Sequence, residues 1–143
     1  MFPRKPSEKL RLQVKKRAKN ICEYCRSQAD FSSQPFAIEH IKPFALGGKT
    51  ILSNLAFACQ GCNGHKFTHT DGLDTITHKQ VPLFNPRKQK WSEHFIWNDD
   101  FTLIIGKTPS GRATVELLEL NREGCKNLRL ALFYFGTHPP SEE

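Results

Sequence analysis

The chain has 143 residues, of which 38% are hydrophobic, and its formal net charge is +7. This length fits a single domain over residues 1–143 with a modest core. No segment approaches the ~20 consecutive apolar residues of a membrane span, and no apolar stretch follows Met1, which predicts a soluble, cytoplasmic protein with no membrane partner.

The positive charge is concentrated at the N-terminal end of the chain. Residues 1–26 contain nine Lys or Arg residues and two Glu residues, a net charge of +7, whereas the remaining twelve cations and twelve acids cancel. A basic patch of this kind favours a polyanion such as DNA or RNA. A charge run is also typical of a solvated helix face, so the patch by itself leaves both interpretations open.

A helix is predicted over residues 7–19. Ser7 follows Pro6 and is a suitable N-cap, and apolar residues recur at helical spacing from Leu10 to Ala18. Cations that lie off this apolar face are predicted to contact the phosphates of a nucleic acid. They are Arg11, Lys15, Lys16 and Lys19.

Four of the five cysteines form two C-x-x-C pairs, Cys22 with Cys25 and Cys59 with Cys62. In a chain without a secretion signal, such pairs indicate metal ligands before disulfides. Ordinary buried thiols are the alternative, but two pairs in so short a chain favour one tetrahedral zinc site. Because four thiolates leave no open position for a substrate, the Zn²⁺ is predicted to be structural. The fifth cysteine, Cys125, is expected to be buried and inert.

The segment between and after the cysteine pairs predicts two strands followed by a helix. Glycines permit a sharp reversal between the strands. The expected elements are a strand that begins at Phe36 and ends at Glu39-His40, a loop through Gly47-Gly48, a strand over residues 51–58 that has Asn54 within it or at its start, and a helix over residues 63–70.

The C-terminal part is expected to contain a loop, a hairpin and two helices. Thr108 before Pro109 is typical of a helix start, and apolar residues recur at helical spacing near the end of the chain. The expected elements are an extended loop over residues 71–90, a hairpin of residues 91–97 and 101–105, a helix over residues 109–120, and a last helix that carries Cys125, Leu128, Leu132 and Phe135.

Three polar residues of the central segment have the chemistry of a hydrolytic site. His40 could act as a general base, because a neutral imidazole titrates near neutral pH. Glu39 offers hard oxygen ligands for Mg²⁺, and Asn63 offers a neutral amide oxygen next to the second cysteine pair. Taken singly, each residue is more commonly structural than catalytic.

The combination resembles the HNH endonucleases, which have the ββα-metal fold, in their zinc-bearing four-cysteine branch. The resemblance covers residues 22–66. Within the family, the chain is similar to small stand-alone bacterial members. The segments that carry it are Glu39-His40-Ile41-x-Pro43, Gly47-Gly48, Asn54-Leu55 and Cys59-x-x-Cys62-Asn63-x-x-Lys66. Many members of the family have Asp where this chain has Glu39. The three letters of the family name fall on His40, Asn54 and Asn63.

This resemblance implies a role for each matching residue. His40 would activate the attacking water, and Asn54 would brace the loop between the strands. Glu39 and Asn63 would hold one divalent ion, Mg²⁺ or Mn²⁺, on the scissile phosphate. Lys66 is a candidate phosphate contact.

The resulting prediction is an α+β protein with a ββα-metal core, a structural four-cysteine zinc site, a basic N-terminal helix and a C-terminal hairpin plus helices. Its expected parts are residues 1–21, 22–70 and 71–143. It would hydrolyse phosphodiester bonds of DNA, double-stranded rather than single-stranded, as a monomer or weak dimer. The alternative is a non-catalytic, zinc-stabilised nucleic-acid-binding module. Sequence specificity and biological setting, for example bacterial or phage defence, are not indicated.

Overall fold

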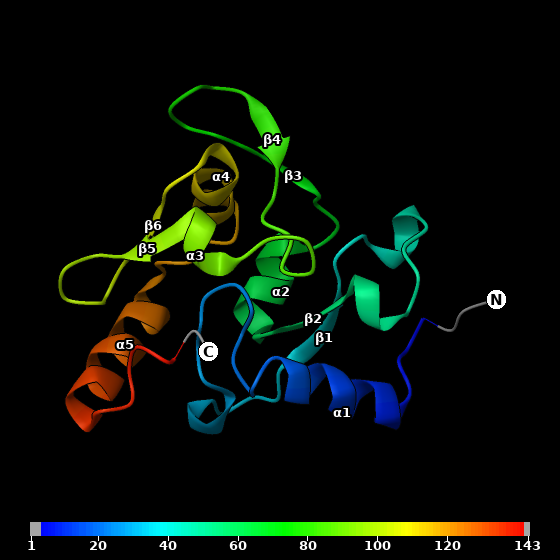
Figure 1. The fold of residues 1–143 in the computed structure, drawn as a ribbon, viewed down its shortest axis with the longest axis horizontal. Coiled ribbons are helices and arrows are strands. Elements are labelled where there is room, and N and C mark those ends of the chain that lie inside the picture. Colours follow the sequence, from blue (N-terminus) through cyan, green and yellow to red (C-terminus); the bar gives the residue numbers. More distant parts are fainter. Residues whose placement is uncertain (1–3, 142–143) are drawn as a thin grey trace.

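The computed structural model describes residues 4–141 (Figure 1). Within them, the helices are α1 (Glu8–Arg17), α2 (Gln60–Lys66), α3 (Trp91–His94), α4 (Pro109–Leu117) and α5 (Glu123–Phe135). The strands form antiparallel pairs: β1 (Ala37–His40) with β2 (Leu55–Ala58), β3 (Asp71–Leu73) with β4 (Gln80–Pro82), and β5 (Phe95–Trp97) with β6 (Ile104–Gly106). This mixture confirms the α+β class.

The N-terminal helix α1 forms where it was predicted and lies beside the first strand pair (Figure 1). Ser7 caps it, because its Oγ accepts a hydrogen bond from the backbone N–H of Leu10 at 3.2 Å. Val14 is fully buried, and Arg17 donates to the carbonyl oxygens of Leu52, just before β2, and of Leu55, the first residue of β2. The helix ends two residues before Lys19, which has a left-handed backbone with φ of 55°.

The central unit has the predicted order of strand, loop, strand and helix. β1 and β2 pair so that His40 lies opposite Leu55, and α2 packs against β1. The predicted start of this helix at residue 63 is wrong, because α2 begins at Gln60. Its N-cap is Cys59, whose sulfur accepts a hydrogen bond from the N–H of Cys62.

The C-terminal part differs from the prediction in residues 71–90, which contain the β3–β4 hairpin instead of only an extended loop. Asp74 holds this hairpin in place. Its buried carboxylate accepts hydrogen bonds from Arg112 of α4 at 2.8 and 3.0 Å and from the Thr77 hydroxyl at 2.7 Å. α4 packs against β3, β4 and β6, so it joins the two C-terminal hairpins.

The predicted hairpin of residues 91–97 and 101–105 is shorter than expected, since Trp91–His94 form the helical turn α3. Thr108 caps α4 as predicted, and α5 covers the expected residues. Arg129 of α5 is only 4% exposed and donates to the carbonyl oxygens of Leu120 and Cys25, which ties α5 to the cysteine-bearing loop. Among residues 4–141, no helix is both long and apolar enough to cross a bilayer.

Candidate active site and zinc site

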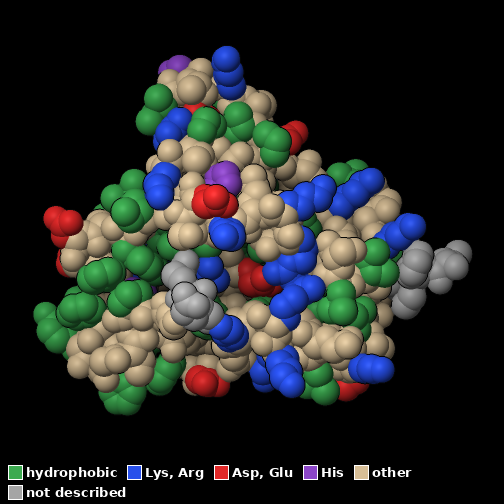
Figure 2. Space-filling view, in the orientation of Figure 1, with side chains coloured by type: hydrophobic (Ala, Val, Ile, Leu, Met, Phe, Trp, Pro, Cys, Tyr) green, Lys and Arg blue, Asp and Glu red, His purple; other side chains and the backbone are tan. Residues whose placement is uncertain are grey.

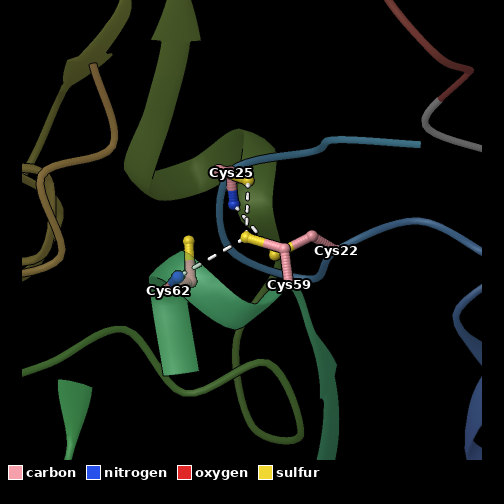
Figure 3. Close-up of side chains that lie close together, drawn as sticks. All are labelled: Cys22, Cys25, Cys59 and Cys62. Atoms are coloured by element: carbon pink, nitrogen blue, oxygen red, sulfur yellow. Dashed lines mark hydrogen bonds between the residues drawn. The ribbon is translucent and has the colours of Figure 1, made fainter. Parts of the chain in front are cut away.

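The four paired cysteines come together as the spacing predicted (Figure 3). Cys59 and Cys62 lie at the N-terminal end of α2, and Cys22 and Cys25 lie in the loop before β1. Their sulfur atoms all lie within 4.8 Å of one another, and those of Cys25 and Cys59 are 3.6 Å apart. Four sulfurs bound to one zinc at ~2.3 Å are roughly 3.8 Å from one another. The cluster therefore fits a closed, tetrahedral zinc site.

Two residues of the C-terminal part surround this cluster. Arg122, just before α5, donates to the sulfur of Cys59 at 3.1 Å and lies near that of Cys62. Although burial lowers the pKa of Arg122, the neighbouring cysteine sulfurs raise it above its usual value. A hydrogen bond between Cys125 and Cys25 lowers the pKa of the Cys25 thiol. Cys125 is buried as predicted and lies beside Cys25, outside the group of four clustered sulfurs.

His40 ends β1 and is partly buried. Its Nε2 lies 2.8 Å from the Thr50 hydroxyl, and its ring meets that of Phe44 edge-on at 5.8 Å. Burial, together with the charges of Arg4 and Lys66, lowers the pKa of His40. The imidazole is therefore neutral at neutral pH, as a general base requires.

Glu39 lies next to His40, but its carboxylate is already hydrogen-bonded to other side chains of the protein. Its side chain is buried, with the Lys66 ammonium 2.7 Å from Oε2 and the Tyr24 hydroxyl donating to Oε1. Burial raises the pKa of Glu39, while Lys66 and Tyr24 act in the opposite direction. A carboxylate accepts about four hydrogen bonds, so lone pairs remain on both oxygens.

The two asparagines occupy different places. Asn54 precedes β2 and spans the loop between the strands, because it accepts from the N–H of Lys42 and donates to the carbonyl oxygens of Lys42 and Lys49. These hydrogen bonds are of the kind that the resemblance implies for Asn54. Asn63 lies within the first turns of α2, not at its first residue, and it lines the cavity beside His40.

One cavity of about 490 Å³ gathers Glu39, His40 and Asn63. Arg4 and Lys5 of the N-terminal segment line the same cavity, and the guanidinium of Arg4 lies over the Phe44 ring. These cations were not predicted here, because they precede the first predicted helix and belong to no periodic pattern. Figure 2 shows further Lys and Arg side chains spread over the middle of one face and along its lower edge, where α1 runs.

The predicted nucleic-acid contacts divide into two groups. The predicted phosphate contact of Lys66 is wrong. Lys66 is 2% exposed, and its ammonium is hydrogen-bonded to Glu39 and to the Ile41 carbonyl oxygen instead of facing a ligand. Arg11 and Lys15 line a second cavity of about 370 Å³ beside α1. Lys15, Lys16 and Lys19 are exposed, although Lys19 lies beyond the end of the helix.

Residues 22–68, which include the four clustered cysteines, Glu39, His40 and Asn63, match the sequence model of the family described as HNH endonuclease. These residues form an HNH endonuclease domain. The chain is also 29% identical over 116 residues to Septu protein PtuB of Bacillus thuringiensis, across 79% of this chain and 41% of that protein. It thus spans less than half the length of this curated relative. No solved structure matches the chain significantly.

The donors that line the HNH cavity suit a divalent ion. Carboxylate and amide oxygens from Glu39 and Asn63 are ligands that Mg²⁺ accepts, and the cavity has room for the waters that Mg²⁺ retains. The Lys66 ammonium beside Oε2 opposes a second cation near that oxygen. The donor set therefore fits one divalent ion, whose binding Lys66 would weaken.

Several residues of the HNH site carry no local sequence signal. Tyr24 lies between Cys22 and Cys25, and its sequence position indicates only a core aromatic residue. In the structure its hydroxyl donates a hydrogen bond to Glu39. Thr50 follows the glycine loop as an ordinary turn residue, yet it contacts His40. Arg122 is about 60 residues from the cysteines that it contacts. Only the folded chain brings these residues together.

Proposed function

We propose that the protein is a metal-dependent HNH endonuclease that hydrolyses phosphodiester bonds of DNA. The observation that carries this proposal is the cavity in which His40, Glu39 and Asn63 meet beside two cations, Arg4 and Lys5. Hydrolysis of a phosphodiester needs a base for the attacking water, ligands for a metal ion and positive charge near the phosphate. A neutral imidazole, hard oxygen donors and two cations supply these groups. The matching HNH family supports the same chemistry.

Each group has a distinct part in the proposed reaction. His40 takes the proton of the attacking water, and its lowered pKa keeps it neutral for that step. Glu39 and Asn63 would hold one Mg²⁺ or Mn²⁺, which would stabilise the charge on the phosphate and the leaving oxygen. Arg4 and Lys5 would hold the phosphates that flank the bond to be cut. Zinc on the four cysteines would be structural.

The second candidate is a zinc-stabilised module that binds nucleic acid without cutting it. The buried pair of Glu39 and Lys66 favours this alternative, because an ammonium already neutralises the carboxylate that would hold the metal. In that case the cavity would bind a phosphate only through its cations.

Plasmid cleavage tests the proposal and separates the two candidates. The zinc-loaded protein is expected to nick or cut plasmid with Mg²⁺ or Mn²⁺, and EDTA is expected to abolish this cleavage. His40→Ala removes the base and should lower the rate by roughly 10²- to 10⁴-fold. His78→Asn is the matched control, because His78 lies in the exposed β3–β4 turn with a left-handed backbone that Asn tolerates.

Wild-type protein that binds DNA but cuts it under no metal would exclude the nuclease and support the binding module. Equal cutting by wild type and His40→Ala would remove His40 as the base. Zinc content and circular dichroism of His40→Ala confirm that a lost rate is not a lost fold.

The role of α1 predicts a strong salt dependence of DNA binding. Each phosphate contact contributes a slope of about −0.9 in a plot of log affinity against log salt concentration. Lys15→Gln and Lys16→Gln should each reduce that slope by about 1 and weaken binding to all duplexes alike. Lys126→Gln on α5 is the control for loss of a cation elsewhere. Binding that does not change with salt would contradict this role of α1, and a parallel titration with duplex RNA measures the preference for DNA.

A further inference from the structure

Thr50 is a buried residue that touches two parts of the proposed active site. It is 5% exposed and follows the glycine loop between β1 and β2. Its Oγ1 lies 2.8 Å from Nε2 of His40 and 3.2 Å from the backbone carbonyl oxygen of Arg4. One hydroxyl therefore connects the imidazole with the N-terminal segment that lines the cavity.

The hydrogen-bond chemistry of these three groups fixes the position of a proton. A carbonyl oxygen can only accept, so the single hydroxyl hydrogen of Thr50 points to Arg4. The lone pairs of that hydroxyl must then accept from Nε2–H of His40. In the neutral imidazole the other nitrogen, Nδ1, carries no hydrogen and keeps its lone pair. Among the described residues, no group donates a hydrogen bond to this Nδ1.

We propose that Thr50 is a positioning residue that holds His40 in the Nε2–H tautomer and so leaves Nδ1 as the atom that accepts the proton of water. This inference rests on the proposed nuclease function. It adds to that function the atom of His40 that acts as the base and the residue that selects this atom. The second contact of Thr50, to Arg4, is required, because without it the hydroxyl could turn and donate to Nε2.

The surroundings of His40 support a positioning role for Thr50. Phe44 packs edge-on against the imidazole and restricts its rotation, so the Thr50 contact orients a ring that is already confined. Arg4 lies over the same Phe44 ring and lines the cavity. Docking of the N-terminal segment and the tautomer of the base are thereby coupled through one side chain.

Nitrogen NMR tests the tautomer without any need for activity. Two-bond proton–nitrogen spectra of the ¹⁵N-labelled, zinc-loaded protein distinguish the two neutral forms of an imidazole. Wild type is expected to show Nε2 protonated and Nδ1 unprotonated for His40. Thr50→Val keeps the shape but removes the hydroxyl, so it should shift His40 to a mixture of tautomers. Thr50→Ser keeps the hydroxyl and should keep the wild-type spectrum.

Cleavage rates of the same variants test whether Thr50 matters for the reaction. Thr50→Val is expected to lower kcat by about 10-fold or more with little change in KM, because it disturbs a group that orients the base. Thr50→Ser should restore most of the rate, which loss of packing alone would not explain. Thr75→Val, in the exposed β3–β4 turn, controls for the substitution itself.

The possible results separate this inference from the proposed function. An Nδ1–H tautomer in wild type, or an unchanged spectrum in Thr50→Val, would overturn the role of Thr50 even if the protein cuts DNA. The expected spectra in a protein that does not cut would support the tautomer and reject the nuclease. Loss of cutting in Thr50→Val without a tautomer shift, and without recovery in Thr50→Ser, would reduce Thr50 to a packing residue and overturn the proposal.

Discussion

Replacement of Cys62 by Ser, or removal of zinc with a strong chelator, is expected to unfold the HNH domain. The cluster joins the loop of Cys22 and Cys25 to the end of β2 and the start of α2, where Glu23 and Phe57 also exchange hydrogen bonds. Structural zinc in small domains contributes an apparent ~10–16 kcal/mol, which is comparable to the ~5–15 kcal/mol stability of a whole domain. Circular dichroism should show lost helix, and released zinc can be titrated with a chromophoric chelator.

Cys125→Ala is the matched control for this experiment. Cys125 contacts Cys25, but it lies outside the group of four sulfurs that could share one ion. This variant should therefore keep one zinc per chain and its helical content, whereas Cys62→Ser should lose both. A Cys62→Ser protein that is folded and free of zinc would show that the cluster is not a structural metal site.

The spacing of the cysteines was sufficient to predict this cluster, because two C-x-x-C pairs in a short chain are typical of a zinc site. The order of β1, β2 and α2 was also predictable, since short apolar segments, a glycine pair and a helix after the second cysteine pair leave little choice. The start of α2 was missed because Cys59 acts as a helix cap through its sulfur. Cysteine is not among the usual capping residues.

The β3–β4 hairpin was not predictable from local sequence. Its strands have three residues each, and one ends in Pro82, which normally argues against a strand. The hairpin depends on Asp74, which binds Arg112 from α4, 38 residues along the chain. Contacts over such distances leave no periodic pattern in either segment, so the sequence predicted a loop.

Lys66 shows the same limit within the proposed active site. Lysine is almost never fully buried without a partner, so its sequence position predicted a surface contact with phosphate. Its partner is Glu39, 27 residues earlier, and the pair forms only when α2 packs against β1. The motif residues could be assigned from sequence, but their pairing could not.

Lys66→Met is expected to lower the free energy of unfolding by about 3–5 kcal/mol, because it leaves the carboxylate of Glu39 buried without its cation. Lys66 and Glu39 are 2% and 3% exposed in their side chains, so water cannot replace the lost ammonium. Urea unfolding of the zinc-loaded protein in buffer without Mg²⁺ measures the change. Lys88→Met, at an exposed position, should change stability by less than about 0.5 kcal/mol.

The loss in Lys66→Met should depend on pH in a defined direction. Burial already raises the pKa of Glu39, and removal of the ammonium raises it further. An acid whose pKa is higher in the folded state destabilises the fold when it is ionised. The full loss is therefore expected above the folded pKa of Glu39, and it should shrink as the pH falls toward the ordinary pKa of a glutamate. A loss that grows on acidification would contradict the ionised pair.

Mg²⁺ added to Lys66→Met then tests whether Glu39 can hold a divalent ion. With the competing ammonium removed, an ion bound to Glu39 and Asn63 should return part of the lost stability in proportion to the logarithm of its concentration. The double variant Glu39→Gln with Lys66→Met should be more stable than Lys66→Met without Mg²⁺, since no buried charge is left unpaired, and it should gain nothing from the ion. Equal effects of Mg²⁺ on both variants would place the ion elsewhere and leave Glu39 as a structural partner of Lys66.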